Sequence, residues 1–306
     1  MQYVRENIEF EDNYLAFHRW KPDISDYKGI IQIVHGMAEH VKRYEEFAEY
    51  FTDKGFLVCG IDQLGHGETV DLNKGILGYF DKKEGWIKAV NSNKYISKIL
   101  KDRHPEKPLI VFGHSMGSII TRYYLIGERI PKTLILSGIM EYKEILMDFV
   151  KVLAKLEKGL KEDTSENVID NYLLDLIYNR KFNSDNKNNW ISSLEQEVDK
   201  YTRDEKCGFK ITNQMFVDMM EGIKTIDKKE KNKEISKDIP LFIIGGSDDP
   251  VSNYGSDVRK LFDKYKEANL DDVKYKLYSG VRHEVIRDKR NEDVYNDLET
   301  WINDHI

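Results

Sequence analysis

Ser115 lies in a Gly-x-Ser-x-Gly pattern, Gly113–Gly117, whose flanks fit a strand before it and a helix after it. The preceding run, 108–112, is short, apolar and β-branched, which predicts a buried strand. The following run, 118–126, has helical spacing and ends at Gly127. A serine on a tight strand-to-helix turn presents its hydroxyl above the sheet edge, where it can attack a carbonyl carbon.

The residues around Ser115 indicate how the turn forms and which N–H groups would stabilise the negative charge on the reacting carbonyl oxygen. Gly113 and Gly117 are needed because a side chain at either position would collide with the adjoining strand and helix. Met116 begins the helix, so its N–H points toward the reacting carbonyl, where the positive helix end also helps. The second donor is expected in the loop after the strand at 29–34, where Met37 is the candidate. The sequence therefore predicts an oxyanion hole formed by the N–H groups of Met37 and Met116.

A serine is a poor nucleophile unless a base activates it and an acid orients the base. After an elbow of this kind the chain order is serine, acid, histidine. Two histidines follow, His283 and His305. His305 falls in the last turn of the final predicted helix, whereas His283 follows a predicted strand, 273–278, through a short loop. We therefore predict His283 as the base; the alternative is a loop histidine that caps the next helix.

The acid is expected where the predicted strand 241–244 runs into two glycines followed by Asp248 and Asp249. Asp249 precedes Pro250 and is therefore held extended, which could aim it toward the histidine. Spacing favours Asp249 but leaves Asp248 as an alternative.

Three other polar residues are interpreted as loop-bracing side chains: His35 and Asp62 at predicted strand ends, and His66 between Gly65 and Gly67. No carboxylate–histidine spacing typical of a metal site surrounds them. The chain also contains no phosphate-binding loop and no dinucleotide fingerprint followed by a ribose-binding acid. We predict neither a metal nor a cofactor.

Composition bounds the class of protein. The 306 residues suit one large α/β domain, alone or with an insertion, and 40% of them are hydrophobic. The net charge of -7, with both signs mixed along the chain, argues against nucleic acid as a partner and against strong attraction to anionic membranes. Two cysteines, Cys59 and Cys207, predict no structural disulfide and a reducing compartment. The chain start lacks the apolar segment of a signal peptide and no long apolar run occurs, so we predict a cytoplasmic protein.

Most of the chain alternates between strand and helix patterns, which predicts a mainly parallel sheet covered on both faces. Residues 1–20 alternate around Glu11-Asp12-Asn13 and predict an antiparallel hairpin at one edge. Strands are further expected at 29–34, 56–61, 108–112, 133–137, 241–244 and 273–278, and helices at 39–51, 84–103, 118–126, 254–268 and 291–305.

Residues 141–235 interrupt this alternation and predict an all-helical insertion between a first core segment, 1–140, and a second, 236–306. Two apolar helical stripes, at 145–160 and 168–178, would form a lid over the site. The alternative is that both stripes pack on the main domain. An exposed stripe would allow transient contact with a membrane or micelle.

The end of this insertion predicts a further helix at 214–223. The lysine-rich run that follows, 227–237, is interpreted as a solvated connector back to the sheet.

Five ordered motifs together resemble the α/β-hydrolases of the monoacylglycerol lipase and bacterial lysophospholipase group. They are 35–44, 62–67, 113–117, 246–249 and 280–285. The segments 190–201 and 207–209 are similar to the cap of that group, so the resemblance spans nearly the whole chain. One departure is Gln63-Leu64, where the family usually has a basic pair or His-Arg; it bears on loop packing and not on catalysis.

The resemblance implies an eight-stranded, mainly parallel α/β-hydrolase sheet with a helical cap. It implies Ser115 as nucleophile, His283 as base and Asp249, the last residue of the Gly-Ser-x-Asp motif, as acid. It also implies Met37 and Met116 as oxyanion donors. In the lipases, the residues that match Glu39 and Arg43 lie near the polar end of the glycerol pocket, although both could equally brace the loop.

The expected activity is hydrolysis of single-chain lipid esters, a monoacylglycerol or a lysophospholipid, without a cofactor. The wider family also includes small-ester carboxylesterases and peptidases, which are the alternative. A non-enzymatic binding module is disfavoured because all three triad positions are filled. The oligomeric state is not predicted.

Overall fold

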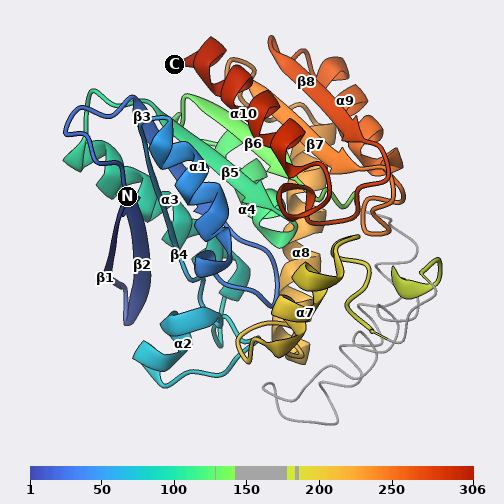
Figure 1. Ribbon diagram of the computed structural model, residues 1–306, viewed down its shortest axis with the longest axis horizontal. Coiled ribbons are helices and arrows are strands. Elements are labelled where there is room, and N and C mark those ends of the chain that lie inside the picture. The colour runs from blue at the N-terminus through green and yellow to red at the C-terminus, as the bar shows by residue number, and fades with distance from the viewer. Residues whose placement is uncertain (128, 142–177, 183–185) are drawn as a thin grey trace.

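The computed structural model describes residues 1–127, 129–141, 178–182 and 186–306, and these form a twisted sheet between two layers of helices (Figure 1). The described strands make one eight-stranded sheet in the order β1-β2-β4-β3-β5-β6-β7-β8. The strands are β1 (Gln2–Phe10), β2 (Asn13–Lys21), β3 (Gly29–Val34), β4 (Phe56–Ile61), β5 (Leu109–His114), β6 (Thr133–Ser137), β7 (Leu241–Gly246) and β8 (Val273–Tyr278). The predicted fold class is confirmed.

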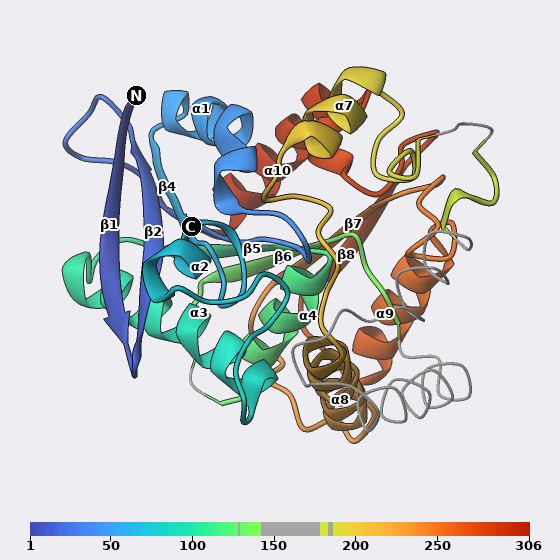
Figure 2. The same ribbon diagram turned by 90° about the horizontal axis from the view of Figure 1, so that it is seen from below.

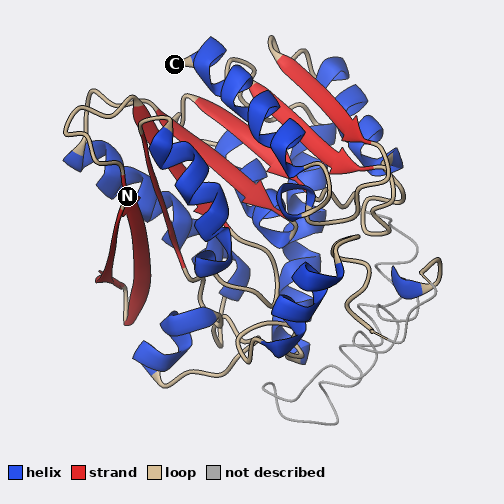
Figure 3. Cartoon of the chain, in the orientation of Figure 1, coloured by secondary structure: helices blue, strands red, loops and turns tan. Residues whose placement is uncertain are grey.

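The predicted edge hairpin is β1 and β2, which pair antiparallel from end to end, and β2 also runs antiparallel to β4. The other neighbours pair in parallel, so the carboxyl ends of β3 to β8 meet at one edge of the sheet. The central strands are buried along their whole length because both sheet faces are covered, which explains their continuous apolar runs (Figure 3).

Helices cover both faces of this sheet (Figure 2). The described helices are α1 (Glu45–Asp53), α2 (Gly67–Asn73), α3 (Gly85–Arg103), α4 (Met116–Arg122), α7 (Glu195–Arg203), α8 (Asn213–Lys231), α9 (Ser256–Glu267) and α10 (Asn291–His305). One buried cluster joins α1 and α10 to the sheet, and a larger one joins α3, α4, α8 and α9 to the opposite face. Among them, none combines the length and apolar character needed to cross a bilayer.

The helix α2 was not predicted, because it starts in the glycine-rich stretch Gly65-His66-Gly67, which is typical of a loop. Its first turn is held by a residue outside the helix: Asp62 Oδ2 accepts the Glu68 N–H at 2.7 Å. A Cβ on Gly67 would collide with that carboxylate, so glycine is required where the chain turns with φ 48°. The cap is non-local, which is why helix-start patterns miss it.

Between β6 and β7 the described residues include α7 and α8. The first predicted apolar stripe, 145–160, and nearly all of the second, 168–178, lie outside the described residues. The helix predicted at 214–223 is confirmed as α8, which is longer than expected and ends at Lys231. It packs on the core helices α3 and α4.

The interpretation of 227–237 as a solvated connector is wrong for its first part. Asp227 and Glu230 are buried on α8, where they belong to an ionic cluster with Arg122 of α4 and Lys264 of α9. Arg122 Nε donates to Glu230 Oε1 at 2.7 Å, and Lys264 Nζ donates to Asp227 Oδ1 at 2.9 Å. The two acids lie one helical turn apart and face inward, so a run that is lysine-rich overall still has a buried side.

Replacing Glu230 with glutamine should destabilise the fold by about 3 kcal/mol, because it removes the bidentate partner of a fully buried guanidinium. Chemical denaturation measures this change. The control is Glu234→Gln, which alters an exposed carboxylate paired with Lys229. Equal denaturation midpoints for the two variants would show that the buried cluster contributes nothing to stability.

Candidate active site

The strand-to-helix turn around Ser115 has the strained geometry that its glycines predict. Ser115 lies between β5 and α4 with φ 53° and ψ −121°, a conformation rare for a residue with a side chain. A Cβ on Gly117 would collide with Val34 O, and a Cβ on Gly113 would collide with Thr121 Oγ1. The two glycines therefore let α4 pack close enough to β3 and β5 for the turn to form.

The structure brings His283 and Asp249 together from the loops that follow β8 and β7. His283 Nδ1 lies 3.1 Å from Asp249 Oδ1, and both side chains are buried. Asp249 Oδ1 also accepts the Val251 N–H at 2.9 Å, which fixes the carboxylate. Asp248, the alternative left open by spacing, is exposed and accepts a hydrogen bond from Ser247.

The other ring nitrogen of His283, Nε2, is buried and has no hydrogen-bond partner within the described ranges. Ser115 and His283 line the same pocket, although Ser115 Oγ and His283 Nε2 are not hydrogen-bonded in this structure. Catalytic hydrogen bonds are often long without substrate and tighten when it binds. The unpaired nitrogen is thus available to accept a proton in the pocket.

Aromatic rings and a glycine hold the imidazole in place. The ring centroids of His114 and Trp190 lie 4.8 Å and 5.1 Å from that of His283. A Cβ on Gly138 would lie 2.8 Å from His283 Cε1, too close for any real side chain. Gly138, at the end of β6, therefore makes room for the imidazole.

The two histidines differ in protonation. Burial lowers the pKa of His283, but the adjacent Asp249 carboxylate outweighs burial and raises that pKa above its usual value. Burial and the neighbouring His283 lower the pKa of His114 to about 3. His114 therefore stays neutral near pH 7, and the proton exchange expected there belongs to His283.

The predicted oxyanion donors, Met37 and Met116, lie in the loop after β3 and at the start of α4. Met37 lines the pocket. Across the described part of the chain, neither backbone N–H donates a hydrogen bond to another protein group.

The loop that contains Met37 is anchored through the adjoining Ala38. Ala38 has φ 53°, and its carbonyl accepts hydrogen bonds from Tyr201 Oη at 3.0 Å and from Gly208 N at 2.9 Å. The loop is thus anchored to α7 and to the segment after it.

A second anchor is a bracing cluster of four buried side chains: Glu39, Arg43, Glu284 and Arg287. Glu39 Oε2 accepts from Arg43 at 2.9 Å and from Arg287 at 3.1 Å. Arg43 also binds Glu284 through two hydrogen bonds of 2.6 Å and 2.9 Å. Glu284 follows His283 directly. The bracing cluster therefore joins the loop after β3, residues 35–40, called the oxyanion loop below because it carries Met37, to the loop after β8 that carries His283.

Glu39 also positions the oxyanion loop itself. Its Oε1 accepts the Gly36 N–H at 2.6 Å and the Tyr44 hydroxyl at 2.9 Å. Burial raises the pKa of Glu39, but Arg43 and Arg287 outweigh burial and lower it to about 2, so the carboxylate is charged at neutral pH. Glu39 borders the pocket with both oxygens engaged, and Arg43 lies behind it. Both residues brace the loop, and the expectation that they bind glycerol stays a prediction.

Replacing Glu39 with glutamine should lower kcat by about a hundredfold, because it loosens the loop that carries Met37, a predicted oxyanion donor. It should also destabilise the fold by about 3 kcal/mol, since two buried guanidiniums lose a carboxylate. Steady-state kinetics and denaturation measure the two effects. The control is Glu46→Gln, which alters an exposed carboxylate paired with Lys200. A Glu39 variant that keeps the kcat of this control would contradict the bracing role.

Glu284, Arg287, Trp190 and Gly138 were not assigned roles from the sequence. The sequence gives a partial indication of Glu284 and Arg287, because an acid and a base three positions apart follow the predicted base His283 directly. The sequence gives no indication of the roles of Trp190 and Gly138, because only the fold places them against His283.

The interpretation of His35, Asp62 and His66 as bracing residues is confirmed. His35 Nε2 accepts the Gln63 N–H at 2.9 Å, and Asp62 Oδ1 accepts the Val41 N–H at 2.9 Å. His66 bonds the carbonyl of Leu64 through Nδ1 at 2.9 Å. Gln63, the departure from the family pattern, also donates through its side chain to His35 O, so the loop remains tightly packed.

A serine elbow at the centre of a mostly parallel sheet with this strand order places the molecule among the α/β-hydrolases. A family model described as serine aminopeptidase, S33 (Hydrolase_4) matches residues 25–290. The chain therefore belongs to this family of hydrolases, and the resemblance drawn from the five motifs is confirmed.

Relatives match over nearly the whole length. A monoacylglycerol lipase of Mycolicibacterium smegmatis is 26% identical over 303 residues, covering 95% of this chain and 94% of that protein. The phospholipase YtpA of Bacillus subtilis is 24% identical, covering 94% of this chain and 99% of that protein. Among solved structures, a thermostable carboxyl esterase from Bacillus coagulans in complex with glycerol has a TM-score of 0.88 at 25% identity, covering 100% of this chain and 99% of that one.

Proposed function

We propose that this hydrolase cleaves carboxylic esters of single-chain lipids, a monoacylglycerol or a lysophospholipid, through a Ser115–His283–Asp249 triad. The observation that carries the proposal is the hydrogen-bonded His283–Asp249 pair, whose unpaired Nε2 lies in the pocket that Ser115 lines. The names of the lipase and phospholipase relatives support the substrate class.

In this mechanism Ser115 Oγ attacks the ester carbonyl while His283 Nε2 takes the hydroxyl proton. The carbonyl oxygen becomes an oxyanion that accepts hydrogen bonds from the N–H groups of Met37 and Met116, each worth about 3 kcal/mol of barrier. His283 then gives its proton to the leaving alcohol, and an acyl-enzyme remains on Ser115. Water, deprotonated by His283, releases the fatty acid, and Asp249 holds the imidazole in the required tautomer throughout.

The described part of the pocket suits an acyl chain. Its lining is mostly apolar and aromatic, with polar groups near Ser115, around Asn188 and at Lys210. The apolar and aromatic members larger than glycine are Met37, Ala38, Tyr178, Trp190, Ile191, Tyr201, Phe209 and Ile211.

A peptidase is the second candidate, because the matching family model carries that description. An aminopeptidase needs a carboxylate free to bind the substrate ammonium group. Within the described lining, the two carboxylates are Glu39 and Glu284, and both are already paired with arginines. The lining therefore favours the ester over the peptide.

A substrate panel tests the proposal. Monoacylglycerol, lysophosphatidylcholine, p-nitrophenyl esters of graded chain length and an amino-acid p-nitroanilide would be assayed side by side. We expect kcat/KM to rise with acyl chain length beyond butyryl and the anilide to remain unhydrolysed. An optimum at acetyl or butyryl esters without turnover of long chains would reject the lipid substrate, and cleavage of the anilide alone would establish the peptidase.

A further inference from the structure

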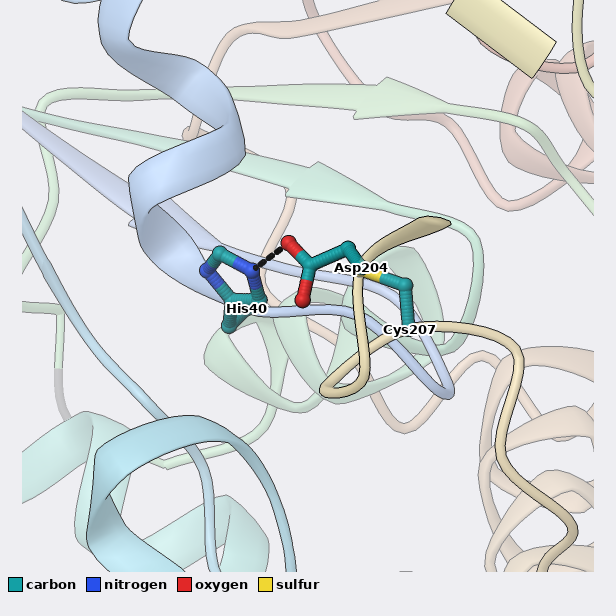
Figure 4. Close-up of side chains that lie close together, drawn as sticks. All are labelled: His40, Asp204 and Cys207. Carbon is teal, nitrogen blue, oxygen red and sulfur yellow. Dashed lines mark hydrogen bonds and ion pairs between the residues drawn. The ribbon is translucent and has the colours of Figure 1, made fainter. Parts of the chain in front are cut away.

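Three side chains with different donor atoms meet beside the oxyanion loop, at a place the mechanism does not use. His40 lies at the end of that loop, while Asp204 and Cys207 lie in the turn that follows α7 (Figure 4). One nitrogen, one oxygen and one sulfur from these residues all lie within 4.8 Å of one another. His40 Nε2 and Asp204 Oδ2 are 2.8 Å apart.

These donors match the preference of one class of ion. An imidazole, a carboxylate and a thiolate together suit a borderline-soft divalent metal such as Zn²⁺, whereas Mg²⁺ and Ca²⁺ take oxygen ligands. Three protein ligands leave a fourth tetrahedral position for water. We propose that His40, Asp204 and Cys207 form a zinc site that joins the oxyanion loop to the segment after α7.

Burial and access fit such a site. Cys207 is 8% exposed, so its sulfur is shielded from competing solvent, whereas the Asp204 side chain is 34% exposed and leaves the ion a route of entry. Next to it, Gly208 N donates to Ala38 O at 2.9 Å, so the backbones on the two sides of the cluster are already joined. Ligand atoms of one tetrahedral zinc lie about 3.3 to 3.8 Å apart, so donors that are all within 4.8 Å need only side-chain adjustment to surround the ion.

Metal binding here involves proton release and no redox change. Zn²⁺ keeps one bound water and releases the others as His40 Nε2, an Asp204 oxygen and Cys207 Sγ bind. The thiol proton leaves to solvent as the Zn–S bond forms. The proton that His40 Nε2 donates to Asp204 Oδ2 also leaves, and a proton from solvent binds Nδ1, so the ring coordinates through Nε2 as a neutral imidazole.

The sequence predicted no metal site, because His40 and Asp204 are 164 residues apart and only the fold brings them together. The proposal is independent of the substrate, since it concerns a cluster outside the triad. Its consequence for the molecule is local: a bound ion would tie down the loop that contains Met37 and Ala38.

Titration with Co²⁺ tests the site directly, because the absorption spectrum of bound Co²⁺ depends on its ligands and on their geometry. We expect one Co²⁺ per chain, a thiolate-to-cobalt charge-transfer band in the near ultraviolet, the visible bands of four-coordinate cobalt, and loss of all of these when Zn²⁺ is added. Cys207→Ser should abolish the charge-transfer band. Cys59→Ala is the matched control, because Cys59 is buried in β4 and should leave the band unchanged. A band that is absent from the natural chain, or that persists in Cys207→Ser, would overturn the proposal.

Thermal unfolding gives a second readout for variants that retain a thiol. Zn²⁺ at a hundredfold excess over its dissociation constant should raise the unfolding midpoint by about 4 °C. His40→Asn and Asp204→Asn should each remove most of this shift, and Asp199→Asn, which alters an exposed carboxylate on α7, should keep it. The same shift in all three variants would show that zinc binds elsewhere.

Discussion

Replacing Ser115 with alanine is expected to lower kcat for ester hydrolysis by about a millionfold, because the attacking oxygen is removed. KM should change little, since the pocket and the oxyanion donors remain. A p-nitrophenyl decanoate assay at high enzyme concentration, with circular dichroism to check folding, measures the loss.

Ser236→Ala is the matched control, because Ser236 lies outside the described pocket lining, in the chain that leads back to β7. It should keep full activity. A Ser115→Ala protein that hydrolyses the ester as fast as this control would remove Ser115 from the mechanism.

Replacing Asp249 with asparagine is expected to lower kcat by about ten-thousandfold near neutral pH, because an amide stabilises the wrong histidine tautomer. Asp249 is also the group that raises the pKa of His283. Catalysis needs the neutral ring, so in the natural chain kcat/KM should fall as pH drops through a pKa above the ordinary histidine value. Without the carboxylate, the residual activity should fall off at lower pH than in the natural chain. The pH profile of kcat/KM measures both effects.

Asp248→Asn is the matched control for this experiment, because it changes the same chemical group one position earlier. Asp248 is exposed, and its carboxylate takes no part in the hydrogen bond between His283 and Asp249. Its rate and pH profile should equal those of the natural chain. If instead Asp248→Asn showed the larger loss, the acid of the triad would be Asp248 and the observed pair would be structural.

Much of this site could be predicted from the sequence because its parts are local patterns. The elbow Gly113–Gly117 is defined by five adjacent residues, and strand ends that meet at one sheet edge place Asp249 and His283 near it. The choice between Asp248 and Asp249 needed the family resemblance, since adjacent positions share a spacing. In the structure Asp249, and not Asp248, lies against the imidazole.

The parts that could not be predicted are contacts between distant segments. Arg287 reaches Glu39 across 248 positions, and Arg122 reaches Glu230 across 108. No periodicity pairs such residues, and buried charges look like surface charges in a sequence. The interpretation of 227–237 as solvated was partly wrong for this reason. It rested on the number of charged residues, and that number does not show that α8 buries one side of the run.

The central claim is that one serine, activated by His283, is the nucleophile. It is tested most directly by reaction with a fluorophosphonate followed by mass spectrometry of the digested protein. The account predicts a single adduct per chain, on the peptide that contains Ser115, and a labelling rate that falls sharply in His283→Ala. Equal labelling of the Ser115→Ala protein, or an adduct on a different serine, would contradict it.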